Sequence, residues 1–451
     1  MHAIDRKRLG ALLDRERAMH TLRTPRSRAA FEAADHLLGR VPMTWMNKWS
    51  GGYPLYLDSA IGNRVRDVDG NEYVDFALGD TGAMAGHTPA ATVAAVQRRL
   101  SVGGITAMMP SLDAEWVAVE LSRRFGLPQW SFSLSATDAN RWALRLARLV
   151  TGRPMVLAFS YCYHGSVDET FVISGRDGEA LPRAGNVGPA VPVGQTTRVA
   201  EFNDLGSVEA ALAHRDVAVL IMEPALTNIG IVLPEPGFLD GVREVCTRHG
   251  TLLLIDETHT ISAGPGGCTA EWGLRPDILV IGKSIGGGIP SGAYGVSDEI
   301  ASALHDHEDA DLVDTGGVGG TLAGSVLSTA AMRATLGEVL TDAAFEHMVA
   351  LGVRFREGVE EVLARHEVPW SVVQLGARAE YRFCAPAPVT GTESAQAHDG
   401  ELEEYLHLHM SNRGVLMTPF HNMALMCPDT TSADVDLHTV LFDHAVADLR
   451  G

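Results

Sequence analysis

The middle of the chain alternates compact apolar runs of strand length with amphipathic segments of helix length. A run without polar alternation favours a strand that is buried on both faces, and helix-length segments between such runs supply the crossovers that parallel strands need. The pattern predicts an α/β fold with a mainly parallel sheet covered by helices. The five clearest runs are WSFSL (130–134), MVLAFS (155–160), VAVLIMEP (217–224), TLLLIDE (251–257) and DILVIGK (277–283).

The segments before this region predict a helical start followed by a hairpin. Residues 1–40 place apolar side chains at helical spacing among charged ones, which favours one or two surface helices. Residues 53–77 hold two short alternating runs around an Asp-Gly-Asn turn, which is a hairpin signal. Helical spacing returns at 89–99 and at 112–125.

The C-terminal part has the pattern of a smaller α+β domain. A long helix is expected near 343–366, the strand-like segments WSVVQLG and AEYRFC follow, and another helix is expected near 400–412. The polar stretch 386–400 favours an exposed, mobile loop. We expect three parts: an N-terminal part (1–80) that adds to the small domain and to the entrance of the active site, a large domain (81–340) and a small C-terminal domain (341–451).

The charge and the cysteines exclude several classes of partner. Acidic side chains outnumber basic ones by 56 to 36, for a formal net charge of -20, so we expect neither nucleic acid nor a membrane as partner. Five cysteines without a C-x-x-C pair favour neither a disulfide framework nor zinc. Because no apolar run approaches the ~20 residues that span a bilayer and no signal-peptide pattern is present, we expect a cytoplasmic protein.

The scarcity of lysine narrows the search for a reactive amine. Of the 36 basic residues, only Lys7, Lys48 and Lys283 are lysines. Arginine keeps its proton, so lysine alone can serve as an amine nucleophile. Lys283 ends an apolar run and is surrounded by Gly282 and by glycines at 286–288, which let the backbone approach a ligand closely. Lys283 is therefore the predicted catalytic lysine.

Three of the apolar runs end in ionisable side chains. The run at 217–222 is followed by Glu223, the next ends at Asp256, and the last leads into Lys283. Since ligands of open parallel sheets bind beyond the carboxyl ends of the strands, we expect these three groups at one edge of the sheet.

A fourth run leads into a turn of small and hydroxylated residues, Ser135, Ala136 and Thr137, before a helical segment. Free N–H groups at such a helix start favour a phosphate. A phosphate turn, a carboxylate and a lone lysine at one edge are what pyridoxal phosphate requires. The lysine forms a Schiff base with the aldehyde, and the carboxylate keeps the pyridine nitrogen protonated.

Several motifs together resemble those of the class III pyridoxal-phosphate-dependent aminotransferases, a family that includes omega-transaminases and glutamate-1-semialdehyde aminomutase. The resemblance runs from about residue 50 to the C-terminus. It implies the PLP-dependent transferase fold type I and a homodimer with shared active sites. The motifs are LSATDA (134–139), YHG (163–165), IDETHT (255–260), GKSIGGGIPSGAYG (282–295) and GGTLAGS (319–325).

The resemblance assigns roles to individual residues. Lys283 matches the Schiff-base lysine that also moves the substrate proton, and Asp256 matches the carboxylate at the pyridine nitrogen. Tyr163 matches the aromatic residue on the cofactor ring, and Thr321 matches a threonine that reaches the phosphate from the neighbouring subunit. The expected cofactor-binding residues are Ser135, Ala136, Thr137, Tyr163, His164, Glu223, Asp256, Thr258, Lys283 and Thr321.

This sequence also departs from the family pattern. Ala136 stands where the phosphate turn of the family has glycine, and Thr258 stands where an apolar residue normally backs the cofactor ring. The next residue, His259, can contact the cofactor or the substrate, although a buried structural histidine is the alternative that we favour.

The substrate prediction rests on the segment before the hairpin. The aminomutase has an arginine for the substrate carboxylate where Met46 stands here, amid tryptophans. Apolar and aromatic surface in place of an anion site favours a bulky or hydrophobic substrate, although Lys48, Arg378 or Arg382 can still hold a carboxylate. The predicted substrate residues are Trp45, Met46, Lys48, Trp49 and His259.

We therefore expect an aminotransferase that moves an amino group between a bulky amine or amino acid and a keto acid through Lys283, in two half-reactions. One alternative is an aminomutase of the glutamate-1-semialdehyde type, or another isomerase or racemase with the same cofactor. A second alternative, a catalytically silent module that only binds the cofactor, is disfavoured by the intact lysine.

The sequence disfavours two other kinds of site, a phosphate-binding loop and a metal site. A phosphate-binding P-loop ending in Gly-Lys-Ser requires glycine at 277, where Asp277 stands, so a nucleotide kinase is excluded. The remaining candidates for a metal site are two H-x-H pairs that we expect on solvated helix faces, His305 with His307 and His407 with His409.

Overall fold

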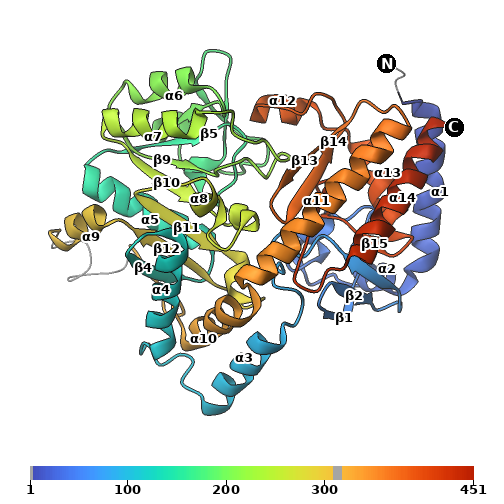
Figure 1. Ribbon diagram of the computed structural model, residues 1–451, viewed down its shortest axis with the longest axis horizontal. Coiled ribbons are helices and arrows are strands. Elements are labelled where there is room, and N and C mark those ends of the chain that lie inside the picture. Colours follow the sequence, from blue (N-terminus) through green and yellow to red (C-terminus); the bar gives the residue numbers. More distant parts are fainter. Residues whose placement is uncertain (1–3, 308–316) are drawn as a thin grey trace. The chain divides into compact units, whose positions relative to one another are not determined.

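The computed structural model describes residues 4–307 and 317–451 and divides into two compact units (Figure 1). The first unit consists of Met1–Thr88, Glu346–Ala387 and Ala397–Gly451, and the second of Pro89–Phe345 and Pro388–Gln396. The domain limits predicted from the sequence, at residues 80 and 340, stay predictions.

The second unit is built around a seven-stranded sheet of order β4-β12-β11-β10-β9-β5-β8. All neighbouring strands pair in parallel except β12, which is antiparallel to both β11 and β4. The mainly parallel sheet that we expected is therefore confirmed. The strands are β4 (Gln129–Ser133), β5 (Met155–Phe159), β8 (Thr197–Ala200), β9 (Val217–Met222), β10 (Leu252–Asp256), β11 (Ile278–Gly282) and β12 (Gly292–Val296).

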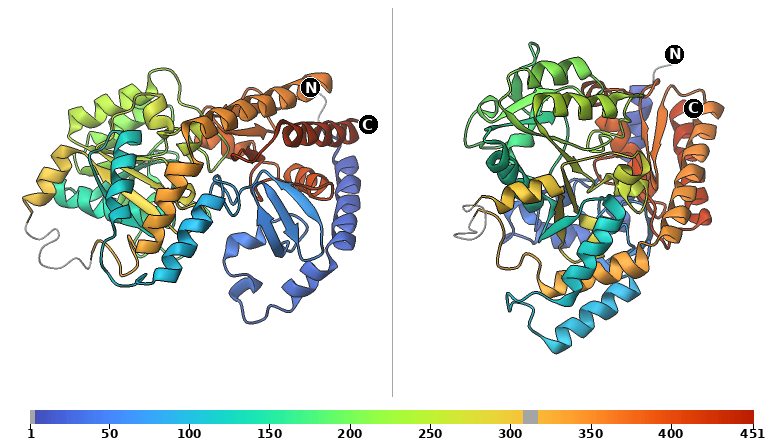
Figure 2. Two further views of the ribbon diagram at one scale, coloured as in Figure 1. Left: turned by 60° about the horizontal axis from the view of Figure 1, so that its bottom comes forward. Right: turned by 60° about the vertical axis from the view of Figure 1, so that its left-hand side comes forward.

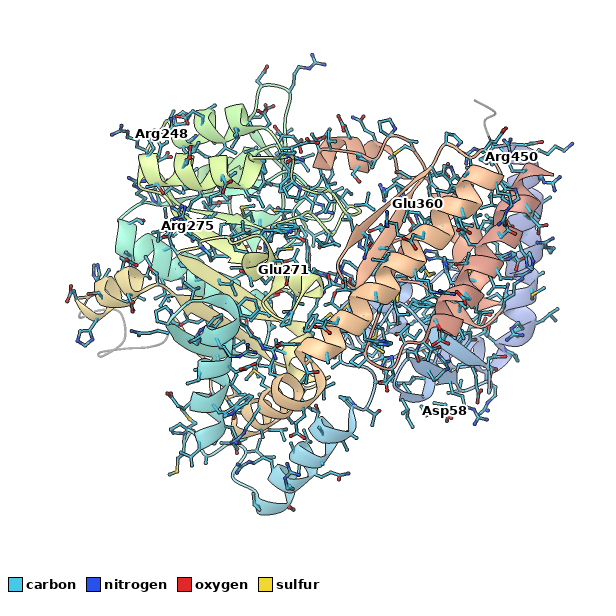
Figure 3. The ribbon with its side chains drawn as sticks, viewed as in Figure 1. Asp58, Arg248, Glu271, Arg275, Glu360 and Arg450 are labelled. Atoms are coloured by element: carbon cyan, nitrogen blue, oxygen red, sulfur yellow. The ribbon has the colours of Figure 1, made fainter. Side chains whose placement is uncertain are left out.

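The apolar runs form strands because both of their faces are covered. Every residue of β5, β9 and β11 is buried. The predicted helix between β9 and β10 is α7 (Phe238–His249), which packs against β10. Its apolar face is buried, whereas Arg248 points outward (Figure 3) and pairs with Glu209 of α6 (Leu205–Leu212) at 2.9 Å.

Helix α5 (Ala136–Thr151) packs against β9, β11 and β12 and carries the expected phosphate turn at its start. Helices α3 (Ala90–Val102) and α4 (Leu112–Phe125), both expected from their spacing, pack beside α10 (Val326–Ala334), as Figure 2 shows. The rest of this unit includes β6 (Val172–Ser174), β7 (Ala180–Pro182), α8 (Gly267–Glu271), α9 (Asp298–His305) and a π-helical turn at Thr335–Val339.

The first unit contains two small sheets, of order β1-β2-β3-β15 and β13-β14-β16. The predicted hairpin is confirmed as β2 (Arg64–Asp67) and β3 (Glu72–Asp75). The other elements are α1 (Arg6–Arg23), α2 (Pro25–Glu32), β1 (Leu57–Ile61), α11 (Asp342–Arg365), β13 (Ser371–Leu375), β14 (Arg378–Arg382), α13 (Gly400–Ser411), β15 (Val415–Leu416), β16 (Met423–Leu425) and α14 (Ser432–Arg450).

The prediction of an exposed loop over 386–400 is wrong for part of that stretch. Residues Gly391–Gln396 form helix α12, and both Gly391 and Ser394 are buried. The Gly391 amide donates to the Glu201 carboxylate at 3.1 Å, and the Ser394 hydroxyl donates to the carbonyl of Ile229. Residues of this polar stretch therefore form hydrogen bonds with other parts of the chain and not only with solvent.

Among the helices of the described ranges, none is both long enough and apolar enough to cross a membrane.

Candidate active site

The predicted meeting of three ionisable side chains at one sheet edge follows from the topology. Strands β9, β10 and β11 are parallel neighbours (Figure 1), so Glu223, Asp256 and Lys283 stand at the same ends of adjacent strands. Strand β4 runs in the same direction, because β12 is antiparallel to both β4 and β11. The turn at Ser135 that follows β4 therefore belongs to this edge too.

Asp256 is a buried carboxylate with three hydrogen-bond donors. It accepts hydrogen bonds from Asn140 Nδ2 at 2.8 Å, from His164 Nδ1 at 3.0 Å and from the Thr258 amide at 3.0 Å. Burial by itself would raise the pKa of Asp256, but His164 and these hydrogen bonds outweigh burial and hold the pKa below its ordinary value. Asp256 therefore stays ionised.

His164 is the charged partner of this carboxylate. Burial by itself would lower the pKa of His164, but Cys162 and Asp256 together hold it well above its ordinary value. An imidazolium paired with a carboxylate at 3.0 Å keeps both side chains fixed.

Four buried polar atoms of residues at this edge of the sheet lack a hydrogen-bond partner among residues 4–307 and 317–451. They are His164 Nε2, Asn140 Oδ1, Thr258 Oγ1 and Ser284 Oγ. A buried polar atom without a partner costs about 1–3 kcal/mol, so such a group indicates a polar ligand or an ordered water. All four residues adjoin the ends of β10 and β11 or contact Asp256, which fits a polar cofactor at this edge.

Close backbone contacts bring the predicted motifs together. A Cβ at Gly282 would lie 2.9 Å from the Ala136 amide nitrogen, so the residue before Lys283 touches the start of α5. A Cβ at Gly165 would lie 2.0 Å from Thr137 Oγ1, so the YHG motif touches the same turn. Ser135 caps α5 by accepting the Asp138 amide at 3.2 Å, while the first N–H groups of a helix have no partner within it. The turn fits a phosphate.

Lys283 follows β11 with an unusual backbone conformation. Its φ of 51° lies in the left-handed region that non-glycine residues rarely adopt. Its Nζ atom lies 2.8 Å from Nε2 of His259. His259 is 6% exposed, and it was predicted either to contact substrate or cofactor or to be structural. The structure places it against the lysine amine.

Glu223 and Tyr163 form a separate arrangement at the same edge. The Glu223 carboxylate accepts the Tyr163 amide at 3.2 Å and both the amide and the hydroxyl of Thr227. Burial raises the pKa of Glu223. The Tyr163 ring packs edge-on against Phe171, with ring centres 5.9 Å apart. Glu223 thus fixes the backbone of Tyr163. The role of Glu223 as a direct cofactor ligand stays a prediction.

The predicted substrate residues of the N-terminal part lie in the first unit. Trp45, Met46 and Trp49 line a pocket of about 460 Å³, where Trp45 packs edge-on against Phe420 at 5.9 Å between ring centres. Lys48 is exposed and is not part of that lining. The structure thus groups Trp45, Met46 and Trp49 around one pocket of the first unit.

Three further predicted residues, Thr321, Arg378 and Arg382, differ in how exposed they are. Thr321 is exposed, and its expected role toward a neighbouring subunit stays a prediction. Arg378 is fully buried and donates to Thr81 Oγ1 at 2.6 Å, and buried Arg382 lies 3.8 Å from Glu380. Both arginines have partners inside the first unit.

The two H-x-H pairs have different surroundings. His305 and His307 are exposed, as expected, but the solvated face predicted for His407 and His409 is wrong, because both lie buried on α13. Burial lowers the pKa of each. Within the part of the chain that the structure describes, no three ligating side chains form a metal site.

Asn140 is the site residue that sequence reasoning missed. It contacts Asp256 and also the carbonyl of His164, at 3.1 Å. Its sequence signal is its place one turn into α5, three residues after the phosphate turn.

Comparisons with known proteins agree with this arrangement. The model of the family described as "Aminotransferase class-III" matches residues 45–443. A glutamate-1-semialdehyde 2,1-aminomutase from Chloroflexus aggregans is 32% identical over 444 residues, which cover 95% of this chain and 99% of that protein.

Solved structures show the same fold. A glutamate-1-semialdehyde-aminomutase variant from Pseudomonas aeruginosa PAO1 in complex with PMP is 46% identical, with a TM-score of 0.96 over 99% of this chain and 100% of that one. An omega-transaminase from Sphaerobacter thermophilus is 29% identical, with a TM-score of 0.86 over 94% and 98% of the two chains. The fold is thus the PLP-dependent transferase fold type I, and the chain belongs to the class-III aminotransferase family.

Proposed function

We propose that this chain moves an amino group with bound pyridoxal phosphate at Lys283, and that the reaction is an aminomutase-type shift between neighbouring carbons of one substrate. The observation that carries the aminomutase assignment is the similarity, at 32% and 46% identity over nearly the whole chain, to two proteins named as glutamate-1-semialdehyde aminomutases. From the sequence we expected an aminotransferase and gave an aminomutase as the alternative; the proposal here prefers the aminomutase.

We propose that different residues of the second unit hold different parts of the cofactor. The turn at Ser135–Thr137 would hold the phosphate, Asp256 would pair with the ring nitrogen, and Tyr163 would contact the ring. Thr258 Oγ1 and His164 Nε2, which lack a hydrogen-bond partner within the described residues, would be available for further polar contacts with the cofactor. Bound pyridoxal phosphate supplies an aldehyde that reacts with amines and a ring that withdraws electrons from the reacting carbon.

The protein's own groups set the charges and move the proton. Asp256 stays ionised because His164, Asn140 and Thr258 stabilise its charge, so it can hold a proton on a ring nitrogen. Lys283 would provide the amine that anchors the cofactor and, once released, would move a proton to and from the reacting carbon. The left-handed backbone conformation of Lys283 sets the direction in which its side chain leaves the end of β11.

An amine balance tests the proposed reaction. The purified protein, loaded with cofactor, is incubated with glutamate-1-semialdehyde and, separately, with amines plus pyruvate. An aminomutase converts the semialdehyde without any added keto acid. Stoichiometric consumption of pyruvate, with no conversion in its absence, would contradict the intramolecular reaction.

A second candidate, transamination of a bulky apolar amine, is supported by one specific observation. The pocket of the first unit is lined mainly by apolar and aromatic side chains, Trp45, Met46, Trp49 and Phe420 among them. Such a lining suits an aromatic or branched substrate better than a short substrate with a carboxylate group. The same amine balance distinguishes the two candidates, because only transamination consumes the keto acid.

We also propose a homodimer. The segment 100–112 exposes five large apolar side chains, from 53% at Leu100 to 89% at Leu112, and exposed apolar clusters of this kind mark association surfaces. We propose that a second copy of the chain covers this surface and that Thr321 of each copy reaches the active site of the other.

We also propose a cytoplasmic location. All five cysteines are free, which supports it.

A further inference from the structure

His259 touches the amine on which the proposed function depends. Its Nε2 atom lies 2.8 Å from Lys283 Nζ, which is a normal hydrogen-bond distance. We propose that His259 is a positioning residue for Lys283: the imidazole orients the amine and takes up the proton that the amine must lose before it attacks a carbonyl carbon. This inference rests on the proposed role of Lys283 as the cofactor anchor.

The imidazole is mounted on a rigid segment. The Asp256 carboxylate accepts the Thr258 amide at 3.0 Å, and the Glu257 carbonyl accepts the Ile261 amide at 2.9 Å. The fully buried Glu257 carboxylate also binds the Thr260 hydroxyl at 2.5 Å. Hydrogen bonds on both sides of His259 therefore fix the backbone from which its ring reaches the lysine.

The lysine is held from its own side as well. Gly282 packs so tightly on the Ala136 amide that a Cβ would approach to 2.9 Å, and Lys283 itself has a φ of 51°. A strained backbone of this kind persists only where the surroundings fix it. Both members of the pair are thus pre-positioned by the fold.

The short distance between the two nitrogens constrains their protonation. An ammonium and an imidazolium are both donors, so a hydrogen bond between them requires that one be neutral. A neutral imidazole accepts an N–H from the ammonium. In the proton transfer, the Nζ–H bond breaks, the Nε2–H bond forms, and the electron pair stays on Nζ. The product is a free amine, the form of lysine that is nucleophilic.

The other ionisable groups at this edge are engaged with different donors. Asp256 pairs with His164, while the Glu257 carboxylate binds Thr260 and Thr269. Glu223 on the neighbouring strand accepts the amide of Tyr163.

The test measures the lysine amine directly, without turnover. The full-length protein is freed of cofactor and treated with acetic anhydride, and acetylation is followed by mass spectrometry from neutral to alkaline pH. The chain has only three lysines, and Lys7 and Lys48 are exposed, so they serve as internal references. The variants are H259Q, which keeps a polar side chain of similar length, H259A, and the control H305Q at an exposed histidine of α9.

We expect acetylation of Lys283 at neutral pH, relative to the two references, to fall roughly 10- to 100-fold in H259Q, at or below the low end of what a positioned base contributes. The rate of pyridoxal phosphate capture falls by a similar factor. Added imidazole restores part of both rates in H259A, which a purely structural role would not produce. H305Q behaves as the wild type.

An H259Q protein that is acetylated at Lys283 and captures the cofactor at wild-type rates would overturn the inference, and so would the absence of rescue by imidazole in a folded H259A. Should H259Q fail to fold, H259N is measured in its place. If the wild-type protein never holds the cofactor at Lys283, the proposed function fails, while the acetylation rates still decide whether His259 acts on the amine.

Discussion

Gly165 and Thr137 approach each other so closely that a Cβ at residue 165 would lie 2.0 Å from Thr137 Oγ1. The contact joins the YHG motif after β5 to the turn that opens α5. Gly165 also has a φ of +81°, which side chains rarely adopt. The two motifs are separated in sequence, yet the geometry of each depends on the other.

The substitution G165A therefore disturbs the phosphate turn. We expect the free energy of unfolding in urea to fall by about 2–4 kcal/mol, from the sum of left-handed strain and overpacking, and the affinity for pyridoxal phosphate to fall with it. G126A is the matched control, because Gly126 has a φ of +78° but open space around its Cβ position. Equal losses in the two variants would show that the contact with Thr137 contributes nothing.

The substitution D256N removes the charge that stabilises the His164 imidazolium. We expect the pKa of His164, measured by NMR, to fall toward its ordinary value, because Asp256 is one of the groups that raise it. Turnover of the loaded enzyme falls on the order of 100-fold, since a ring nitrogen loses its fixed counter-charge. D298N, at an exposed position on α9, leaves both quantities unchanged. An unaltered His164 titration in D256N would contradict the ion pair.

His438 makes the first unit sensitive to acid. It is fully buried and packs against Phe355 and Phe442, at 4.3 and 5.9 Å between ring centres. Burial lowers its pKa to about 3 from an ordinary 6.5. Between these values the unfolded chain binds a proton that the folded chain does not, so stability is lost as the pH falls, by about 1.4 kcal/mol per pH unit.

The substitution H438F removes this difference in proton binding. Urea unfolding measured at about pH 7 and about pH 5 will show a loss roughly 2 kcal/mol smaller in the variant than in the wild type. H36Q, at an exposed histidine, will follow the wild type. The same pH slope in H438F and wild type would show that other groups account for the acid sensitivity.

The exposed apolar side chains of segment 100–112 are expected to bury themselves in a dimer. The double substitution M109E/L112E places two charges where 71% and 89% of these side chains are exposed, and sedimentation should show monomers. V187E, at an equally exposed valine of the same unit, should stay dimeric. A dimer that survives M109E/L112E would place the interface elsewhere.

The sheet was predictable from sequence where burial on both faces produces continuous apolar runs, as in β9, β10 and β11. Strand β12 was missed because two of its five residues are glycines, so it does not form a continuous run of apolar side chains. The final helix α14 was also missed, although Thr431 and Asp434 form a capping box at its start, which is a recognisable signal.

The candidate site was predictable in its strand-end residues and less so in what surrounds them. Lys283 and Asp256 follow from the runs that they end. The contact of Asn140 with Asp256 joins residues 116 positions apart, so the place of Asn140 one turn into α5 does not by itself reveal its partner. His407 and His409 were expected on a solvated helix face, as is usual for H-x-H pairs on polar helices, but tertiary packing buries them.

The measurement that tests the account most directly is peptide mapping of the cofactor-loaded protein after borohydride reduction. Reduction fixes the cofactor to whichever amine holds it, and the chain offers three lysine candidates, Lys7, Lys48 and Lys283. We predict a single pyridoxyl adduct on the peptide that contains Lys283, lost in K283A. An adduct at Lys7 or Lys48, or protein without any adduct, would contradict the central claim.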